Sequence, residues 1–243
     1  MTRKTTASLL VLAAAMAATP AAAQDADVSV SVTVDYVSEY VFRGVSFESE
    51  AVQPGVEVAV GNFAAGVWAS TGLGGDSIAD SDEIDFYAGY GWDLSDTVNL
   101  GVGATWYHFP DGGDTFEGYV GLGFDTPLAP AVTAYYDVEL EAFTLEGGIG
   151  HSVPTGDKTS LDLGAVGGFV TADGPGDYEW ITASAALSYA VSDSGSVYAG
   201  VNYSLSSEDT LNAQVTRLAS GTDVFATTDN DLFWFGVGVA AGF

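Results

Sequence analysis

The chain has 243 residues, no cysteine and a formal net charge of −28, with 33 acidic residues against five basic ones. This balance excludes nucleic acid as a partner, because binding to phosphate needs a basic surface. The lack of cysteine excludes a small exported fold that is held together by disulfides.

The first 23 residues have the pattern of a secretory signal peptide. Arg3 and Lys4 precede an apolar stretch at 7–18, and small residues follow at 21–23. A basic start, a short apolar centre and a small-residue cleavage site are typical of exported proteins, and the apolar stretch is too short for a membrane anchor. We expect cleavage after Ala23, which leaves residues 24–243 as one domain with a net charge of −30.

The mature chain alternates between apolar and polar or small residues in segment after segment. Side chains of a strand point to opposite faces with a period of two, so each segment predicts a strand with one apolar face. Most segments have the length that a tilted membrane-spanning strand needs, and no stretch of 18 apolar residues predicts a transmembrane helix. The twelve segments lie at 28–36, 55–60, 63–72, 83–92, 98–107, 116–124, 132–141, 143–149, 161–169, 180–189, 197–205 and 231–243.

The last segment is the clearest of the twelve. From Asp231 to Phe243 it alternates without a break, with Phe233, Phe235 and Phe243 on the same face. A closing strand with an apolar outer face and a terminal aromatic is similar to the last strand of bacterial outer-membrane barrels. We therefore expect an all-β, antiparallel up-and-down transmembrane barrel of about twelve strands in the outer membrane, with Phe243 as its assembly signal.

Connection lengths agree with this topology, in which periplasmic turns are short and outer loops are long. Short turns are predicted at 61–62, 93–96, 126–130, 154–158 and 192–196. Longer outer connections are predicted at 44–51, 72–82 and 207–228, with a very short one near Glu141 and Ala142 as the exception.

A soluble β-sandwich would also alternate. Aromatic residues near the strand ends argue against it, because they fit the girdles at the two membrane interfaces. Those residues are Tyr40, Phe42, Trp92, Trp106, Phe124 and Phe243.

Four motifs resemble the TorF-type porins of proteobacteria. They are Glu39-Tyr40-Val41-Phe42-Arg43-Gly44-Val45-Ser46, Gly66-Val67-Trp68-Ala69-Ser70, Glu83-Ile84-Asp85-Phe86-Tyr87-Ala88-Gly89-Tyr90 and Tyr135-Tyr136-Asp137. The resemblance covers most of the mature chain and implies an outer-membrane channel without naming its solute.

The inward rows of the predicted barrel are acidic. They hold one cation, Arg43, which we expect to bridge several carboxylates or to hold the lumen together. Acidic rings favour cations in a pore, although acidity can also serve solubility. The predicted pore-lining residues are Arg43, Glu57, Asp85, Glu117, Tyr119, Tyr135, Asp137, Glu139, Glu146 and Glu179, and further inward carboxylates are Asp35, Glu39 and Asp162.

Glycines and tyrosines on the same rows leave two alternatives open. Inward glycines either leave the lumen free or allow close approach of neighbouring groups. Inward tyrosines form either a constriction for a solute or packing along the wall. The tyrosines are Tyr87, Tyr107, Tyr119, Tyr135 and Tyr198.

Catalytic chemistry has little support. The two histidines, His108 and His151, fall at opposite ends of the predicted barrel and cannot share a hydrolase site. No histidine metal site or cofactor is predicted. The loop acids Asp76, Asp80, Asp82 and Glu83 offer the oxygen ligands that Ca²⁺ and Mg²⁺ prefer but lack the ordered spacing of an EF-hand loop, so divalent-cation binding there stays an open alternative.

The sequence thus predicts a non-enzymatic porin for small polar solutes, with a preference for cations. Its expected partners are outer-membrane lipid, lipopolysaccharide, the barrel-assembly machinery and the solutes. The alternatives are a closed structural or adhesion barrel that acts through its loops and, third, a barrel hydrolase.

Overall fold

The computed structural model describes residues 28–73, 82–110, 112–172, 176–217, 220 and 223–243. The predicted signal peptide and its cleavage site lie outside these ranges, and so do the loop acids Asp76 and Asp80. Within them, no helix is long and apolar enough to cross a membrane.

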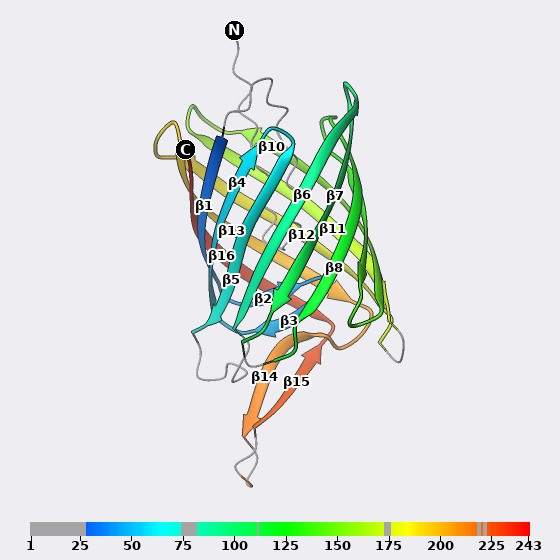
Figure 1. Cartoon of the computed structure of the whole chain (residues 1–243). Coiled ribbons are helices and arrows are strands. Elements are labelled where there is room, and N and C mark those ends of the chain that lie inside the picture. The colour runs from blue at the N-terminus through cyan, green and yellow to red at the C-terminus, as the bar shows by residue number, and fades with distance from the viewer. Residues whose placement is uncertain (1–27, 74–81, 111, 173–175, 218–219, 221–222) are drawn as a thin grey trace.

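Twelve antiparallel strands close into a barrel, as the sequence predicts (Figure 1). Each strand pairs with its neighbours along the chain, and the barrel closes where β1 pairs with β16, for example Val34 with Val239. The barrel strands are β1 (Val28–Val37), β4 (Ala51–Val60), β5 (Phe63–Gly72), β6 (Glu83–Ser95), β7 (Val98–His108), β8 (Thr115–Phe124), β9 (Ala131–Asp137), β10 (Ala142–Pro154), β11 (Thr159–Thr171), β12 (Tyr178–Ala190), β13 (Gly195–Ser206) and β16 (Asp231–Gly242).

The alternation of the sequence decides which side chains face outward. On β4, Val56, Val58 and Val60 are exposed on the outer face, while Gln53 on the opposite row is buried. An apolar belt on the outside of a closed barrel is the arrangement that lipid requires, because closure leaves no unpaired strand edge. The closed sheet excludes the β-sandwich.

The two ends of the barrel differ as expected. Short turns at 61–62, 96–97, 125–130, 155–158 and 191–194 share one end, which we call the short-turn end. The start of β1 lies there too, beside Phe243, whose backbone exchanges two hydrogen bonds with Val30. The longer connections lie at the other end, which we call the long-loop end.

Two further hairpins at the long-loop end are not part of the barrel. The first pairs β2 (Tyr40–Phe42) with β3 (Val45–Glu48), and the second pairs β14 (Leu211–Arg217) with β15 (Asp223–Asp229). Figure 1 shows the second hairpin projecting away from the barrel, where the sequence predicts only a long loop.

Candidate functional site: the lumen and its hairpin

The connection between β1 and β4 folds into the barrel instead of extending away from it. We call its residues Tyr40–Glu48 the lumen hairpin. Arg43 and Gly44 form its turn with φ angles of 47° and 75°, a left-handed conformation that favours glycine. Gly44 also packs so closely on Trp180 of β12 that an added Cβ would clash with the Cβ of Trp180. The prediction of an outer loop at 44–51 is therefore wrong.

Arg43 anchors the tip of the lumen hairpin to the far wall. Its two terminal nitrogens donate hydrogen bonds of 2.6 and 2.9 Å to the two carboxylate oxygens of Glu117 on β8. Its guanidinium also lies 4.0 Å from the ring centre of Tyr135 on β9. In the barrel order, β8 and β9 lie opposite β1 and β4, from which the hairpin starts. The hairpin therefore crosses the whole lumen.

The base of the lumen hairpin is fixed to the near wall. The Tyr40 hydroxyl donates a 2.8 Å hydrogen bond to Glu83 of β6, and its ring packs 5.5 Å from that of Trp68. Tyr40 is thus a lumen residue and not part of an interfacial girdle. Phe42 is also part of the hairpin and packs on Tyr107. The prediction that these two aromatics face the membrane is wrong, because their segment leaves the wall after Val37.

Apolar side chains fill the space around the hairpin. Val41 is only 3% exposed and belongs to a buried cluster with residues from β1, β4, β14 and β16. The cluster consists of Val37, Tyr40, Val41, Ala51, Leu211 and Trp234. A packed apolar cluster between barrel walls excludes water from that part of the lumen. In this conformation the hairpin obstructs the long-loop end.

The projecting hairpin holds the lumen hairpin from outside. The backbone NH of Ser46 donates to the carbonyl of Thr210, and the NH of Asn212 donates to the Ser46 hydroxyl. Next to them, the NH of Ala213 donates a 3.0 Å hydrogen bond to Glu39. The start of β14 therefore binds the lumen hairpin. The long connection between β13 and β16 thus helps to hold this hairpin inside the barrel.

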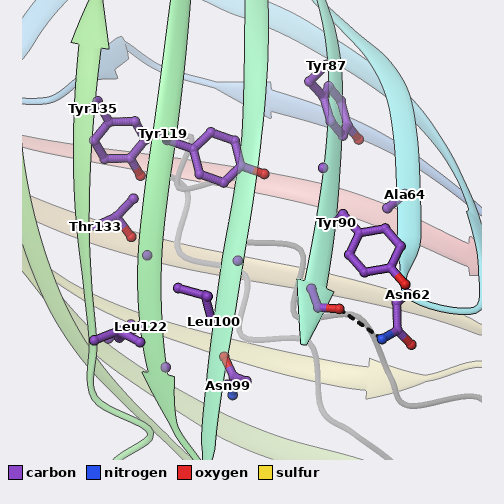
Figure 2. Close-up of a pocket in the computed structure, with 16 residues that line it drawn as sticks. Asn62, Ala64, Tyr87, Tyr90, Asn99, Leu100, Tyr119, Leu122, Thr133 and Tyr135 are labelled. Carbon is purple, nitrogen blue, oxygen red and sulfur yellow. Dashed lines mark hydrogen bonds between the residues drawn. The ribbon is translucent and has the colours of Figure 1, made fainter. Parts of the chain in front are cut away.

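A cavity of about 70 Å³ is lined by Asn62 of a short turn and by residues of β5 to β9 (Figure 2). Its lining carries no charged side chain and includes Tyr87, Tyr119 and Tyr135. Asn62 lies at its edge and donates a 2.8 Å hydrogen bond to the carbonyl of Gly91. Tyr119 and Tyr135 also line a cavity of about 20 Å³ beside Arg43, so the hairpin covers this part of the lumen.

Inward tyrosines lie flat on glycines of neighbouring strands. A Cβ on Gly103 would clash with the Tyr119 hydroxyl, and one on Gly66 would clash with the Tyr87 hydroxyl. Gly238 is covered in the same way by Tyr198. At these three pairs the glycine admits the ring of a neighbouring strand, whereas a Cβ on inward Gly101 would meet nothing within 4 Å, so both alternatives for the glycines occur along the lumen. Tyr107 and Tyr135 differ, because they contact the lumen hairpin.

Most of the predicted carboxylates lie on inward rows, and several of them have a hydrogen-bond partner there. Tyrosine hydroxyls donate to Asp35, Glu57 and Glu146. Asp162 accepts hydrogen bonds from three serines, Ser152, Ser160 and Ser188. Asp137 accepts from the backbone NH groups of Glu139 and Leu140 and so caps the outer turn. Arg43 pairs with Glu117 alone among the described ion pairs, and does not bridge several acids.

Two predicted pore-lining residues are placed differently. β9 ends at Asp137, so Glu139 lies in the exposed turn that follows and accepts a hydrogen bond from the NH of Phe116. Glu179 is exposed on the row of Ile181, because the alternation of β12 turns Trp180 inward. Neither lines the lumen.

The structure adds two buried acidic residues to the inward carboxylates that the sequence predicts. Glu48, on the lumen hairpin, is 2% exposed, and Glu83 is buried beside Asp85 on the inward row of β6. The alternation of β6 could have identified Glu83, which shares a row with Asp85. The position of Glu48 could not be predicted from the sequence, because this residue lies in the connection between two barrel strands, where the strand alternation does not apply.

The two histidines lie at opposite ends of the barrel. His108 bonds Asp114 at the long-loop end, and His151 bonds the carbonyl of Pro127 at the short-turn end. Over the described part of the chain, no group of three or more His, Cys, Asp or Glu side chains is arranged to hold a metal ion.

Comparisons with known proteins agree on the fold. Residues 21–122 match the model of a family described as bacterial protein of unknown function (Gcw_chp). No curated protein matches the sequence. Among solved structures, the NanC porin aligns with a TM-score of 0.55 at 14% identity, over 87% of this chain and 98% of that chain. A KdgM porin, solved in complex with disordered oligogalacturonate, aligns with a TM-score of 0.54 at 12% identity, over 88% and 99%.

These similarities show that the chain has the closed-barrel fold of these porins. They agree with the fold that the TorF-type resemblance implies, whereas membership of the TorF-type family stays a prediction.

Proposed function

We propose that the protein is an outer-membrane channel for small polar solutes with a preference for cations, and that the lumen hairpin controls its outer opening. The observation that carries the cation preference is the charge of the lumen. Asp35, Glu57, Glu146 and Asp162 are partnered by hydroxyl groups and not by cations. Arg43, the one described cation in the lumen, forms an ion pair with Glu117.

Such a lumen attracts cations and repels anions. Charges exposed to water are screened within about 8 Å at physiological salt, but a narrow wall of low dielectric confines the field. We also expect the barrel to contact outer-membrane lipid and lipopolysaccharide, and to be inserted by the barrel-assembly machinery with Phe243 as its signal.

The test is conductance in a planar bilayer, with the reversal potential measured across a salt gradient. We expect currents carried mainly by cations. A preference for anions would contradict the charge argument.

A closed structural or adhesion barrel is the second candidate. It is favoured by the apolar cluster around Val41 and Leu211, which obstructs the lumen, and by the projecting hairpin β14–β15. Absence of current, even after removal of the lumen hairpin, would establish this second function over the first.

A further inference from the structure

Within the described part of the chain, one acidic side chain of the lumen hairpin has no hydrogen-bond partner. Glu48 is 2% exposed, and neither of its carboxylate oxygens accepts a hydrogen bond of ordinary geometry from a described residue. It packs against the end of β5, where a Cβ added to Gly72 would lie 2.6 Å from its carboxyl carbon. A buried carboxylate without partners is costly when ionised, and much less so when it holds a proton.

The groups around Glu48 increase this cost. Glu39, which precedes β2, and Asp82, which precedes β6, both act on Glu48 as negative charges. Its partner across the hairpin is Tyr40, a neutral phenol, and the cation of the hairpin, Arg43, is bound to Glu117. No described positive charge therefore compensates Glu48 where the hairpin is seated.

We propose that Glu48 is a pH-sensitive latch of the lumen hairpin: its neutral form keeps the hairpin seated across the lumen, and its ionisation releases the hairpin and opens the long-loop end. The opening step rests on the proposed channel function, whereas the movement of the hairpin does not.

The direction of the pH effect follows from burial. The pKa of Glu48 is raised from 4.5 to about 7: burial is the largest cause, the nearby backbone NH of Ser49 opposes it in part, and the negative charges of Asp82 and Glu39 add to it. Because the released side chain returns to its ordinary pKa, the proton binds more tightly to the seated state. The contribution of Glu48 to seating is complete below about pH 4.5 and is lost as the pH rises through about 7.

The movement can be measured without any current. The sequence has no cysteine, so Val41→Cys introduces a single thiol at a buried position of the hairpin. Its labelling rate by a membrane-impermeant maleimide reports how often the hairpin leaves its seat. Dividing this rate by that of the same thiol in a Glu48→Gln background removes the pH dependence of the reagent. We expect the ratio to rise by about tenfold or more between pH 4.5 and 7.5.

Two further variants keep the result interpretable. Glu50→Gln changes an exposed carboxylate two residues away and is expected to leave the pH dependence intact. Glu48→Met replaces the unpartnered acid by an apolar chain of similar length. It is expected to keep the thiol introduced by Val41→Cys protected at pH 7.5 even if Glu48→Gln folds poorly.

Identical pH profiles with and without Glu48 would overturn the latch, and so would loss of the pH dependence in Glu50→Gln. If labelling follows Glu48 but no current appears at pH 7.5, the latch stands and the channel function fails. If current flows while labelling is independent of pH, the channel stands and the latch fails.

Discussion

Arg43 and Glu117 are 74 residues apart in the sequence and form a two-pronged ion pair inside the barrel, with both hydrogen bonds at 2.9 Å or less. Arg43 belongs to a hairpin that starts at β1, and Glu117 to the opposite wall. A guanidinium matches a carboxylate in this planar geometry, which a lysine cannot reproduce. The pair therefore determines where the tip of the hairpin lies.

Replacing Glu117 by Gln is expected to free that tip. Removing one partner of a buried ion pair costs about 3–5 kcal/mol, because the other charge remains buried. We expect earlier thermal unfolding, measured as loss of the heat-modifiable band on a gel, and larger or more frequent channel openings. Asp193→Asn, in an exposed turn at the short-turn end, is the control. Unchanged stability in Glu117→Gln would show that the pair does not hold the hairpin.

Removing the obstruction directly is a second test. We expect that replacing residues 40–48 by a short Gly-Ser linker leaves the closed barrel intact, because the backbone ladder of this hairpin is separate from the barrel sheet. Conductance should rise strongly over that of the complete chain. An intact, heat-modifiable barrel that conducts no better would mean that another part of the lumen limits flow.

Two neighbouring glycines provide a matched pair. Gly103→Ala would force the added methyl group against the Tyr119 hydroxyl, whereas a Cβ on Gly101 meets nothing within 4 Å. Overpacking costs about 1–3 kcal/mol, while an unhindered substitution usually stays within about 0.5 kcal/mol. Thermal unfolding should therefore be lowered by Gly103→Ala and left nearly unchanged by Gly101→Ala. Equal effects would contradict the packing of Tyr119 on the wall.

Cation preference is expected to depend on inward carboxylates only. The double change Glu57→Gln and Glu146→Gln should reduce cation over anion permeability, because both side chains face the lumen. Glu139→Gln removes the same type of charge from the exposed outer turn and should have little effect. Reversal potentials, measured in the variant without the lumen hairpin, test both expectations. If Glu139→Gln lowers the cation preference and the double variant does not, the preference arises from the loops.

The barrel itself could be predicted from local sequence. A strand has a period of two, so the alternation of Val56, Val58 and Val60 or of Phe233 and Phe235 specifies both the strand and its outer face. Short turns such as Gly61-Asn62 then leave antiparallel neighbours as the simplest topology. The same alternation identified Glu57, Asp85, Glu117 and Tyr119 as inward.

The path of a connection has no such period. Nothing in the local pattern of Tyr40–Glu48 distinguishes a loop in water from a hairpin that crosses the lumen, because the contacts that decide it come from Glu117, Tyr135, Trp180 and Leu211, all distant in sequence. The strand pattern also could not show that β9 ends at Asp137, which places Glu139 outside the lumen. Local alternation thus determined the wall of the barrel, whereas the contents of the lumen depend on long-range packing, which only the tertiary structure decides.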